Sequence, residues 1–187
     1  MSDRTAFCVQ KLIDAGALLI GTTSMPQFGT NAIGFNTSPK LSSPKNVWDN
    51  QHYAGGSSSG SGIVVALGLC PFAVGSDSLG SIRIPSGCSG IVGLRPTFSR
   101  VSNSDCSEVW TEDPFQTIGP MASCIRDAAA IYLTMAGPDP GFSQGLHQPP
   151  LQPPLFSEFD LSKIRFGYYS DYLSNADPSQ LCSFDEG

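Results

Sequence analysis

A run of glycine and serine residues, Gly55–Gly62 (GGSSSGSG), leads directly into one of the most apolar parts of the chain, IVVALGLCPFAVGSDSLGSIRIP. A flexible linker would separate two self-sufficient segments, whereas this run adjoins a predicted apolar helix and strand. A phosphate-binding P-loop would need a lysine that is missing, since Ser61, Gly62 and Ile63 stand where it would follow. The interpretation that remains is a loop that opens a helix, where glycines let the backbone bend and serine hydroxyls cap N–H groups. Such a helix start favours negative charge, which a substrate oxyanion could use.

The pattern of apolar residues around this run predicts an α/β fold. Residues 6–15 (AFCVQKLIDA) have one apolar helical face and stop at Gly16, and the following ALLIG predicts a short buried strand. Residues 23–54 are rich in Pro, Asn, Ser and Thr, which is typical of a long loop that is functional or packed by its own side chains. Further predicted elements are a helix over 63–69, a strand over 72–75, a helix over 123–137 and a strand at 163–170.

Composition limits the classes of partner. The chain has 187 residues, of which 40% are hydrophobic and 14% charged, as expected for one globular domain or a large piece of one. The net charge is −6 without a basic patch, which argues against nucleic acid as a partner. No run of about 18 apolar residues occurs, so we predict no membrane span. The N-terminus lacks an apolar signal region, and the default expectation is a cytoplasmic location.

The cysteine pattern indicates neither a metal site nor a disulfide framework. No C-x-x-C pair occurs, and only two histidines could join a zinc site, so no metal is predicted. We interpret the cysteines as small buried hydrophobic side chains in a reducing compartment. The six residues are Cys8, Cys70, Cys88, Cys106, Cys124 and Cys182.

A second serine-containing loop, Gly75–Pro85 (GSDSLGSIRIP), lies downstream of the Gly/Ser run and follows the strand predicted over 72–75. The pair resembles the amidase signature family, whose hallmark run is GGSSGGSA, a small-residue helix, a strand, and then G-[ST]-D-x-G-G-S-I-R-x-P. The family continues with G-x-x-G-x-[KR]-P-T and a GPM turn, which correspond here to GIVGLRPT and QTIGPMA. Ser57 and Ser81 are 24 positions apart, and an N-x-W-[DN] element at Asn46–Asp49 precedes both. The resemblance covers Phe7 to about Gly137.

This resemblance implies a three-layer α/β/α fold with a mixed sheet, incomplete at both ends. Residues 1–187 are expected to form a single partial amidase domain. Within it, 6–137 match the family core, 138–162 form a Pro-rich connector, and 163–187 start the following segment.

The resemblance also implies hydrolysis of carboxamide C–N bonds by a Ser–cis-Ser–Lys triad acting on a small-molecule amide, with no cofactor. Ser81 corresponds to the nucleophile, and Ser57, after a cis Gly56–Ser57 bond, corresponds to the serine that relays its proton to a neutral lysine. The family's oxyanion-hole positions match Ser78, Leu79 and Gly80, together with the N–H of Ser81, and the supporting positions match Ser58, Asp77 and Arg83.

The chain departs from the family pattern at the catalytic lysine, which the family places further upstream than this chain begins. The lysines before Ser57 are Lys11, on a helix face expected to be solvated, and Lys40 and Lys45, which match no family position. The alternative to an active amidase is therefore a catalytically silent truncated fragment or paralogue. Oligomeric state and substrate identity stay open.

Two further residues carry expectations of their own. Leu79 stands where the family usually has a glycine, so a positive φ there would strain it and its side chain could crowd the oxyanion hole. His52 could activate a serine in a Ser-His-Asp arrangement, but nothing around it matches such a pattern, and we expect a surface-loop histidine.

Overall fold

The computed structural model describes residues 4–38, 40, 42–104, 106, 115–151, 160–165 and 167. The chain divides into two compact units, Met1–Gln152 and Pro153–Gly187, and the boundary falls within the Pro-rich segment 138–162. The described part of the second unit contains a short 3-10 helix, η4 (Leu161–Lys163). Of the strand predicted at 163–170, the described residues 163–165 and 167 are not in a strand, and the others lie outside the described residues.

The first unit is built around a three-stranded antiparallel sheet. Its strands are β1 (Phe72–Asp77), β2 (Val92–Gly93) and β3 (Thr117–Ala122), in the order β1-β3-β2. All six residues of β3 are buried, as expected for the central strand of a sheet that is covered on both faces. Every pairing among the described strands is antiparallel, whereas a mixed sheet was expected.

The central strand corrects one expectation, because QTIGPMA was predicted to contain a turn. Gly119 and Pro120 lie inside β3, opposite Gly75 and Val74 of β1. Proline cannot donate a ladder hydrogen bond, but the carbonyl of Pro120 still accepts one from the N–H of Leu94, at 3.0 Å. Burial of the whole strand outweighs the low strand propensity of its Gly-Pro pair.

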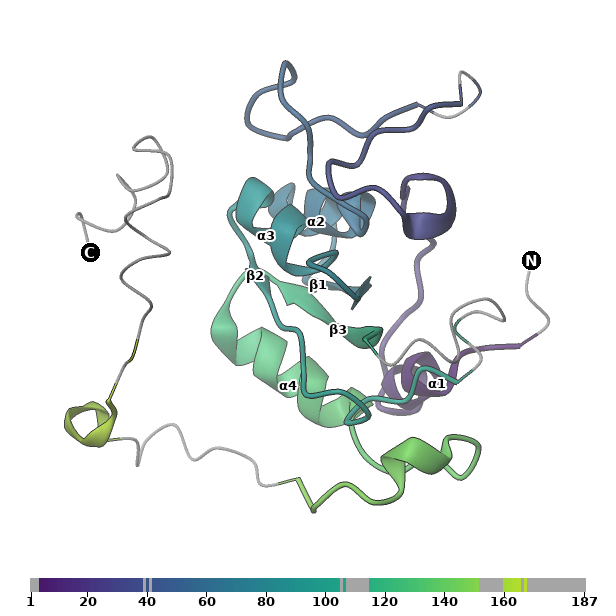
Figure 1. The fold of residues 1–187 in the computed structure, drawn as a ribbon, viewed down its shortest axis with the longest axis vertical. Coiled ribbons are helices and arrows are strands. Elements are labelled where there is room, and N and C mark those ends of the chain that lie inside the picture. Colours follow the sequence, from purple (N-terminus) through teal and green to yellow (C-terminus); the bar gives the residue numbers. More distant parts are fainter. Residues whose placement is uncertain are drawn as a thin grey trace. The chain divides into compact units, whose positions relative to one another are not determined.

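Helices cover both faces of the sheet, which gives three layers (Figure 1). On one face, α2 (Ser59–Ala66) packs against β1 and β3, and α3 (Arg83–Ser89) packs against β2. On the other face, α4 (Ile125–Met135) packs against the sheet, and α1 (Phe7–Asp14) packs against α4. The α/β class and the layered arrangement predicted from the sequence are confirmed.

The main core cluster lies beneath α1 and α4. Cys8 and Leu12 of α1 pack there with Ile118 of β3, Met135 of α4 and the intervening Val101. Burying a side chain of this kind stabilises the fold by about 1.5–3 kcal/mol. The apolar face predicted for residues 6–15 is thus the face that docks on the core.

The short buried strand predicted at ALLIG is wrong. Leu18, Leu19 and Ile20 are 89%, 68% and 76% exposed, and residues 17–20 belong to no strand. A strand needs a neighbour to satisfy its N–H and C=O groups, and no strand pairs with this segment among the described residues. The apolar run therefore predicted neither the strand nor the burial correctly.

The long loop predicted over 23–54 is packed by its own polar side chains, as expected. It contains a 3-10 helix, η1 (Gln27–Gly29), and an isolated bridge between Lys45 and Tyr53. The side chain of Asn36, which is buried, accepts the N–H of Gln27 at 2.9 Å and donates to the carbonyl of Ser42 at 3.1 Å.

The five described cysteines are free thiols that differ in exposure. Cys8 is buried, whereas Cys70 and Cys106 are half-buried. Cys88 and Cys124 are exposed, so the interpretation as buried hydrophobic side chains is wrong for these two residues.

Candidate active site

The two serine loops lie against each other. The backbone N–H of Ser58 donates to the carbonyl oxygen of Ser81 at 3.1 Å. The Gly56–Ser57 peptide bond is cis, as the family resemblance implied. Ser57 is buried, with 3% of its surface exposed, and Ser81 is half-buried. The structure therefore brings the predicted relay and nucleophile loops together.

The Gly/Ser run is partly helix rather than loop. Helix α2 begins at Ser59, so the second half of the run forms its first turn, and Ser58 stands at the N-cap without a side-chain capping bond. Instead, Ser58 Oγ donates to the carbonyl of Ser76 in β1, at 3.3 Å, and accepts the N–H of Ser76 at 3.2 Å. A Cβ on Gly75 would lie 2.8 Å from Ser58 Oγ, so only glycine fits beside this contact. Ser58 thus joins the first serine loop to the strand that leads into the second.

The loop before the Gly/Ser run encloses Ser57. The N–H of Gly56 donates to the carbonyl of Ala32 at 2.6 Å, and a Cβ on Gly56 would lie 2.4 Å from the carbonyl oxygen of Asn31. A Cβ on Gly29 would lie 3.5 Å from Ser57 Oγ, so that backbone also borders the hydroxyl. Composition alone indicated a long loop here but gave no signal that its backbone borders Ser57.

Asp77 fixes the backbone on both sides of Ser81. Its carboxylate is fully buried and accepts the N–H of Gly80 at 2.8 Å and the N–H of Ile82 at 3.1 Å. The guanidinium of Arg83 adds two bonds of 3.0 Å, from Nε to Oδ2 and from Nη2 to Oδ1. Burial alone would raise the pKa of Asp77, but the hydrogen bonds from Arg83 and from these N–H groups outweigh it and lower that pKa. The carboxylate therefore stays ionised and holds the loop through these hydrogen bonds, an arrangement called the Asp77 clasp below.

Arg95 is a second cation on Asp77 that the sequence reasoning missed. Its Nε lies 3.3 Å from Asp77 Oδ1, and its Nη2 donates to the carbonyl of Phe115 at 2.9 Å. The signal was present, because Arg95 is the basic residue of the GLRPT segment that follows the second serine loop.

The predicted oxyanion-hole positions are only partly available. The N–H of Gly80 is committed to Asp77, and Gly80 itself carries the left-handed φ of 128°. Leu79 is not among the described non-glycine residues with positive φ, which are Phe28 and Ser99, so the expected strain is absent. Its side chain is 88% exposed. Neither Leu79 nor Ser81 has an acceptor for its N–H among the described residues.

The relay itself is not formed in the described residues. No hydrogen bond joins the hydroxyls of Ser57 and Ser81, although catalytic bonds often tighten only when substrate binds. No lysine in the described part of the first unit contacts these hydroxyls. Lys40 is exposed, and Lys45 lies 6.0 Å from the ring centre of Tyr53.

Lys11 corrects another expectation, because it is half-buried rather than solvated. Its Nζ donates to the carbonyl of Ala136 at the C-terminal end of α4, and burial lowers its pKa. It therefore has a structural partner on the far side of the sheet from the serine loops. His52 Nδ1 pairs with Asp49 Oδ2 at 2.9 Å in an exposed loop, as expected for a surface histidine.

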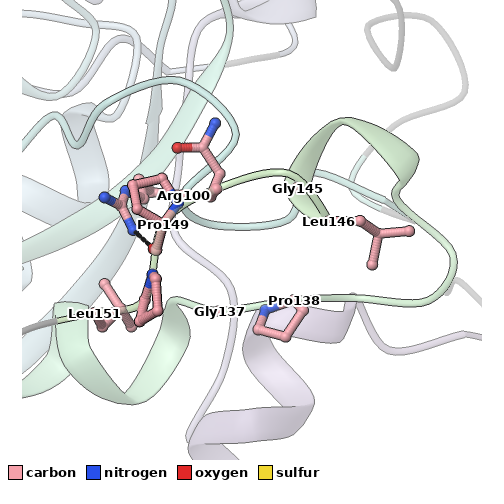
Figure 2. Close-up of a pocket in the computed structure, with 9 residues that line it drawn as sticks. Arg100, Gly137, Pro138, Gly145, Leu146, Pro149 and Leu151 are labelled. Carbon is pink, nitrogen blue, oxygen red and sulfur yellow. Dashed lines mark hydrogen bonds between the residues drawn. The ribbon is translucent and has the colours of Figure 1, made fainter.

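A separate cavity of ≈ 310 Å³ lies where the chain turns after α4 (Figure 2). Arg100 lines it and donates through Nη1 to the carbonyl of Pro149. Its lining includes none of the candidate site residues, so this cavity is not the active site. The lining residues are Arg100, Gly137, Pro138, Gly145, Leu146, Gln148, Pro149, Pro150 and Leu151.

The layered fold and the paired serine loops define an α/β protein in which two serine-containing loops meet beside one strand, β1. The sequence model of the family described as Amidase matches residues 1–185, and the chain belongs to this amidase signature family. The described residues contain no helix long and apolar enough to cross a membrane. They also contain no group of three or more His, Cys, Asp or Glu side chains that could hold a metal ion.

Relatives with several named activities share this part of the family domain. The chain is 34% identical to a fatty acid amide hydrolase of Medicago truncatula over 182 residues, 95% of this chain and 29% of that protein. It is 39% identical to a glutamyl-tRNA(Gln) amidotransferase subunit of Deinococcus deserti over 150 residues, 80% of this chain and 30% of that protein. The native peptide amidase of Stenotrophomonas maltophilia superposes with a TM-score of 0.67 at 31% identity, covering 79% of this chain and 30% of the other. The chain thus spans about 30% of the length of these relatives.

Proposed function

We propose that the protein hydrolyses carboxamide C–N bonds through an acyl-enzyme formed on Ser81. The observation that carries this proposal is the clasp of Asp77 on both sides of Ser81, with the buried Ser57 loop bonded to the carbonyl of Ser81. A serine hydroxyl is a weak nucleophile and gains reactivity only when its geometry and proton acceptor are fixed. The clasp supplies the first of these two requirements.

In the proposed reaction, Ser81 Oγ attacks the amide carbon and its proton passes through Ser57 to a base. The tetrahedral intermediate collapses with loss of the amine, and water then hydrolyses the ester on Ser81. Since no lysine in the described part of the first unit lies at the site, we propose that a base from outside these 187 residues receives the proton.

The negative charge of the tetrahedral intermediate would be stabilised by backbone N–H groups near Ser81. The N–H of Gly80 is held by Asp77, so Leu79 and Ser81 are the better donors of the set that also contains Ser78. One donor of this kind is worth about 10²–10³ in rate.

The proposed substrate class is small-molecule amides. The relatives include proteins named for fatty acid amides, peptides and glutamyl-tRNA(Gln), and nothing in the described residues selects among these. The net charge of −6 argues against RNA as a substrate. The free thiols of the five described cysteines fit the expected cytoplasmic location.

The second candidate function is a catalytically silent chain. Two observations on the described residues of the first unit favour it: no lysine contacts the serine loops, and no hydrogen bond joins the two serine hydroxyls. Assays of ammonia or amine release from a panel of primary and secondary amides separate the two candidates, using the chain extended to the length of its relatives. We expect Ser81→Ala to lower the rate by at least about 10³-fold. An extended, folded protein without Ser81-dependent hydrolysis would support the silent alternative.

A further inference from the structure

Two cysteines that are 98 positions apart in the sequence pack in the same core cluster. Cys8 lies on α1, is 1% exposed and belongs to the main core cluster. Cys106 is half-buried, follows the turn at Asn103 and packs against the same cluster. The Cys106 thiol is the largest influence that lowers the pKa of Cys8, and neither cysteine is in a disulfide. This pair lies outside the serine loops and has no part in the proposed reaction.

The surroundings of Cys8 favour its reactive form. The Cys106 thiol lowers the pKa of Cys8 more than burial raises it. Lys11 lies one turn further along α1 and adds positive charge, while the carboxylate of Asp139 acts in the opposite direction. The thiolate is the form that attacks a disulfide, so Cys8 is suited to the resolving step of an exchange.

We propose that Cys8 and Cys106 form a reversible disulfide when the reduced protein meets a small disulfide oxidant such as oxidised glutathione. The two thiols differ in how exposed they are to the oxidant, and this difference decides which of them reacts first. Cys106 is half-buried and can be reached by the oxidant, whereas Cys8 is enclosed in the core.

The exchange balances in two steps. Cys106 Sγ attacks one sulfur of the oxidant, so that a mixed disulfide forms and one glutathione leaves as thiolate. Cys8 Sγ then attacks Cys106 Sγ, the protein disulfide forms, and the second glutathione leaves. Two electrons pass from the protein to the oxidant, and the two thiol protons end on the two released glutathiones.

The new bond would tie α1 to the segment after Asn103. Closing a loop of about 100 residues restricts the unfolded chain strongly, so the oxidised protein is expected to be the more stable form. α1 also carries Lys11, which bonds to the end of α4, and the disulfide would therefore hold both helices on the core.

Peptide mapping tests the proposal directly. Trypsin places Cys8 in Thr5–Lys11, but Val101–Arg126 contains both Cys106 and Cys124. The experiment therefore uses Cys124→Ser, which removes an exposed thiol, and compares the folded protein before and after incubation with oxidised glutathione and blocking of free thiols. We expect a cross-linked peptide whose mass is lower by two hydrogens than the sum of its parts. Separate recovery of the two peptides, each alkylated or glutathionylated, would overturn the proposal.

Thermal unfolding provides the second measurement and its matched controls. We expect oxidation to raise Tm by about 5 °C or more in the wild-type protein. The Cys106→Ser variant should lose this redox dependence, whereas Cys88→Ser, which removes an exposed cysteine, should keep it. A redox-dependent Tm that persists in Cys106→Ser would exclude this pair as its cause. Should Cys106→Ser fail to fold, the peptide map of the Cys124→Ser protein decides alone.

Discussion

The backbone N–H of Ser58 lies 3.1 Å from the carbonyl oxygen of Ser81, and this hydrogen bond joins two loops that are 23 positions apart in the sequence. The bond is possible because each loop is fixed from its own side. Ser58 is anchored to Ser76 of β1, and the Ser81 loop is held by Asp77 at the end of the same strand. β1 therefore sets the position of both candidate catalytic loops.

Removal of the Asp77 carboxylate should destabilise the whole unit. Asp77→Ala would leave the guanidinium of Arg83, the nearby Arg95 and three backbone N–H groups without their common acceptor. Breaking a buried ion pair from one side costs about 3–5 kcal/mol. Urea unfolding should show this loss, whereas the exposed Asp127→Ala should change the free energy of unfolding by about 1 kcal/mol or less. Equal losses in the two variants would contradict the clasp.

The same carboxylate makes stability depend on pH. Because the folded-state pKa of Asp77 lies below its ordinary value of 3.8, the ionised group contributes stability above pH 3.8 that is lost as the pH falls through the folded pKa. The difference in unfolding free energy between wild type and Asp77→Asn should be constant near neutral pH and should shrink below pH 3.8. A difference that stays constant down to the acid limit of folding would show that the charge is not involved.

Two glycine-to-alanine substitutions should change the free energy of unfolding in opposite directions. Gly75→Ala would place a methyl group 2.8 Å from Ser58 Oγ and 3.1 Å from Ile82 Cγ1, and overpacking of this kind costs about 1–3 kcal/mol. Gly87→Ala, within α3, meets nothing within 4 Å and should gain about 0.5–1 kcal/mol from helix propensity. Chemical denaturation of the two variants measures both effects, and a neutral Gly75→Ala would mean that Ser58 and β1 are not in close contact.

Lys11 should act on stability and not on the chemistry of Ser81. Lys11→Met keeps an apolar stem against the core but loses the bond to the carbonyl of Ala136, at a cost of about 1 kcal/mol. The exposed Lys40→Met should be near neutral. Thermal unfolding checks the difference. A loss of Ser81 reactivity in folded Lys11→Met would instead assign Lys11 to the reaction.

The spacing of apolar residues predicted the helices at 6–15 and 123–137 and the strand at 72–75, because that spacing reflects local structure. The family resemblance implied that the two serine loops lie together. The sequence did not predict α3, since a helix that contains Pro85 and Gly87 contradicts propensity. Pro85 is tolerated because it lies in the first turn, where its N–H is not needed. Leu18 is exposed because no described strand pairs with residues 17–20. Whether a segment finds a pairing strand depends on tertiary structure, which the local apolar pattern does not report.

At the candidate site, too, the sequence motif identified residues close together in the chain, but it did not reveal contacts that depend on the tertiary fold. The motif pointed to Ser57, Asp77 and Ser81 as candidate site residues. In the structure the loops that carry them lie against each other. Arg95 was missed because its ion pair with Asp77 depends on how β2 and the segment after it pass the end of β1. The exposure of Leu79 likewise follows from the placement of the left-handed residue at Gly80.

The most direct test of the central claim is covalent labelling of Ser81 by a fluorophosphonate, located by peptide mapping. In the chain extended to the length of its relatives, we predict one probe on Ser81, no labelling in Ser81→Ala and undiminished labelling in the exposed control Ser143→Ala. A folded sample of the 187-residue chain alone should remain unlabelled, because no lysine in the described part of its first unit reaches the serine loops. Labelling that persists in Ser81→Ala, or an extended and folded protein that takes no probe, would contradict the account.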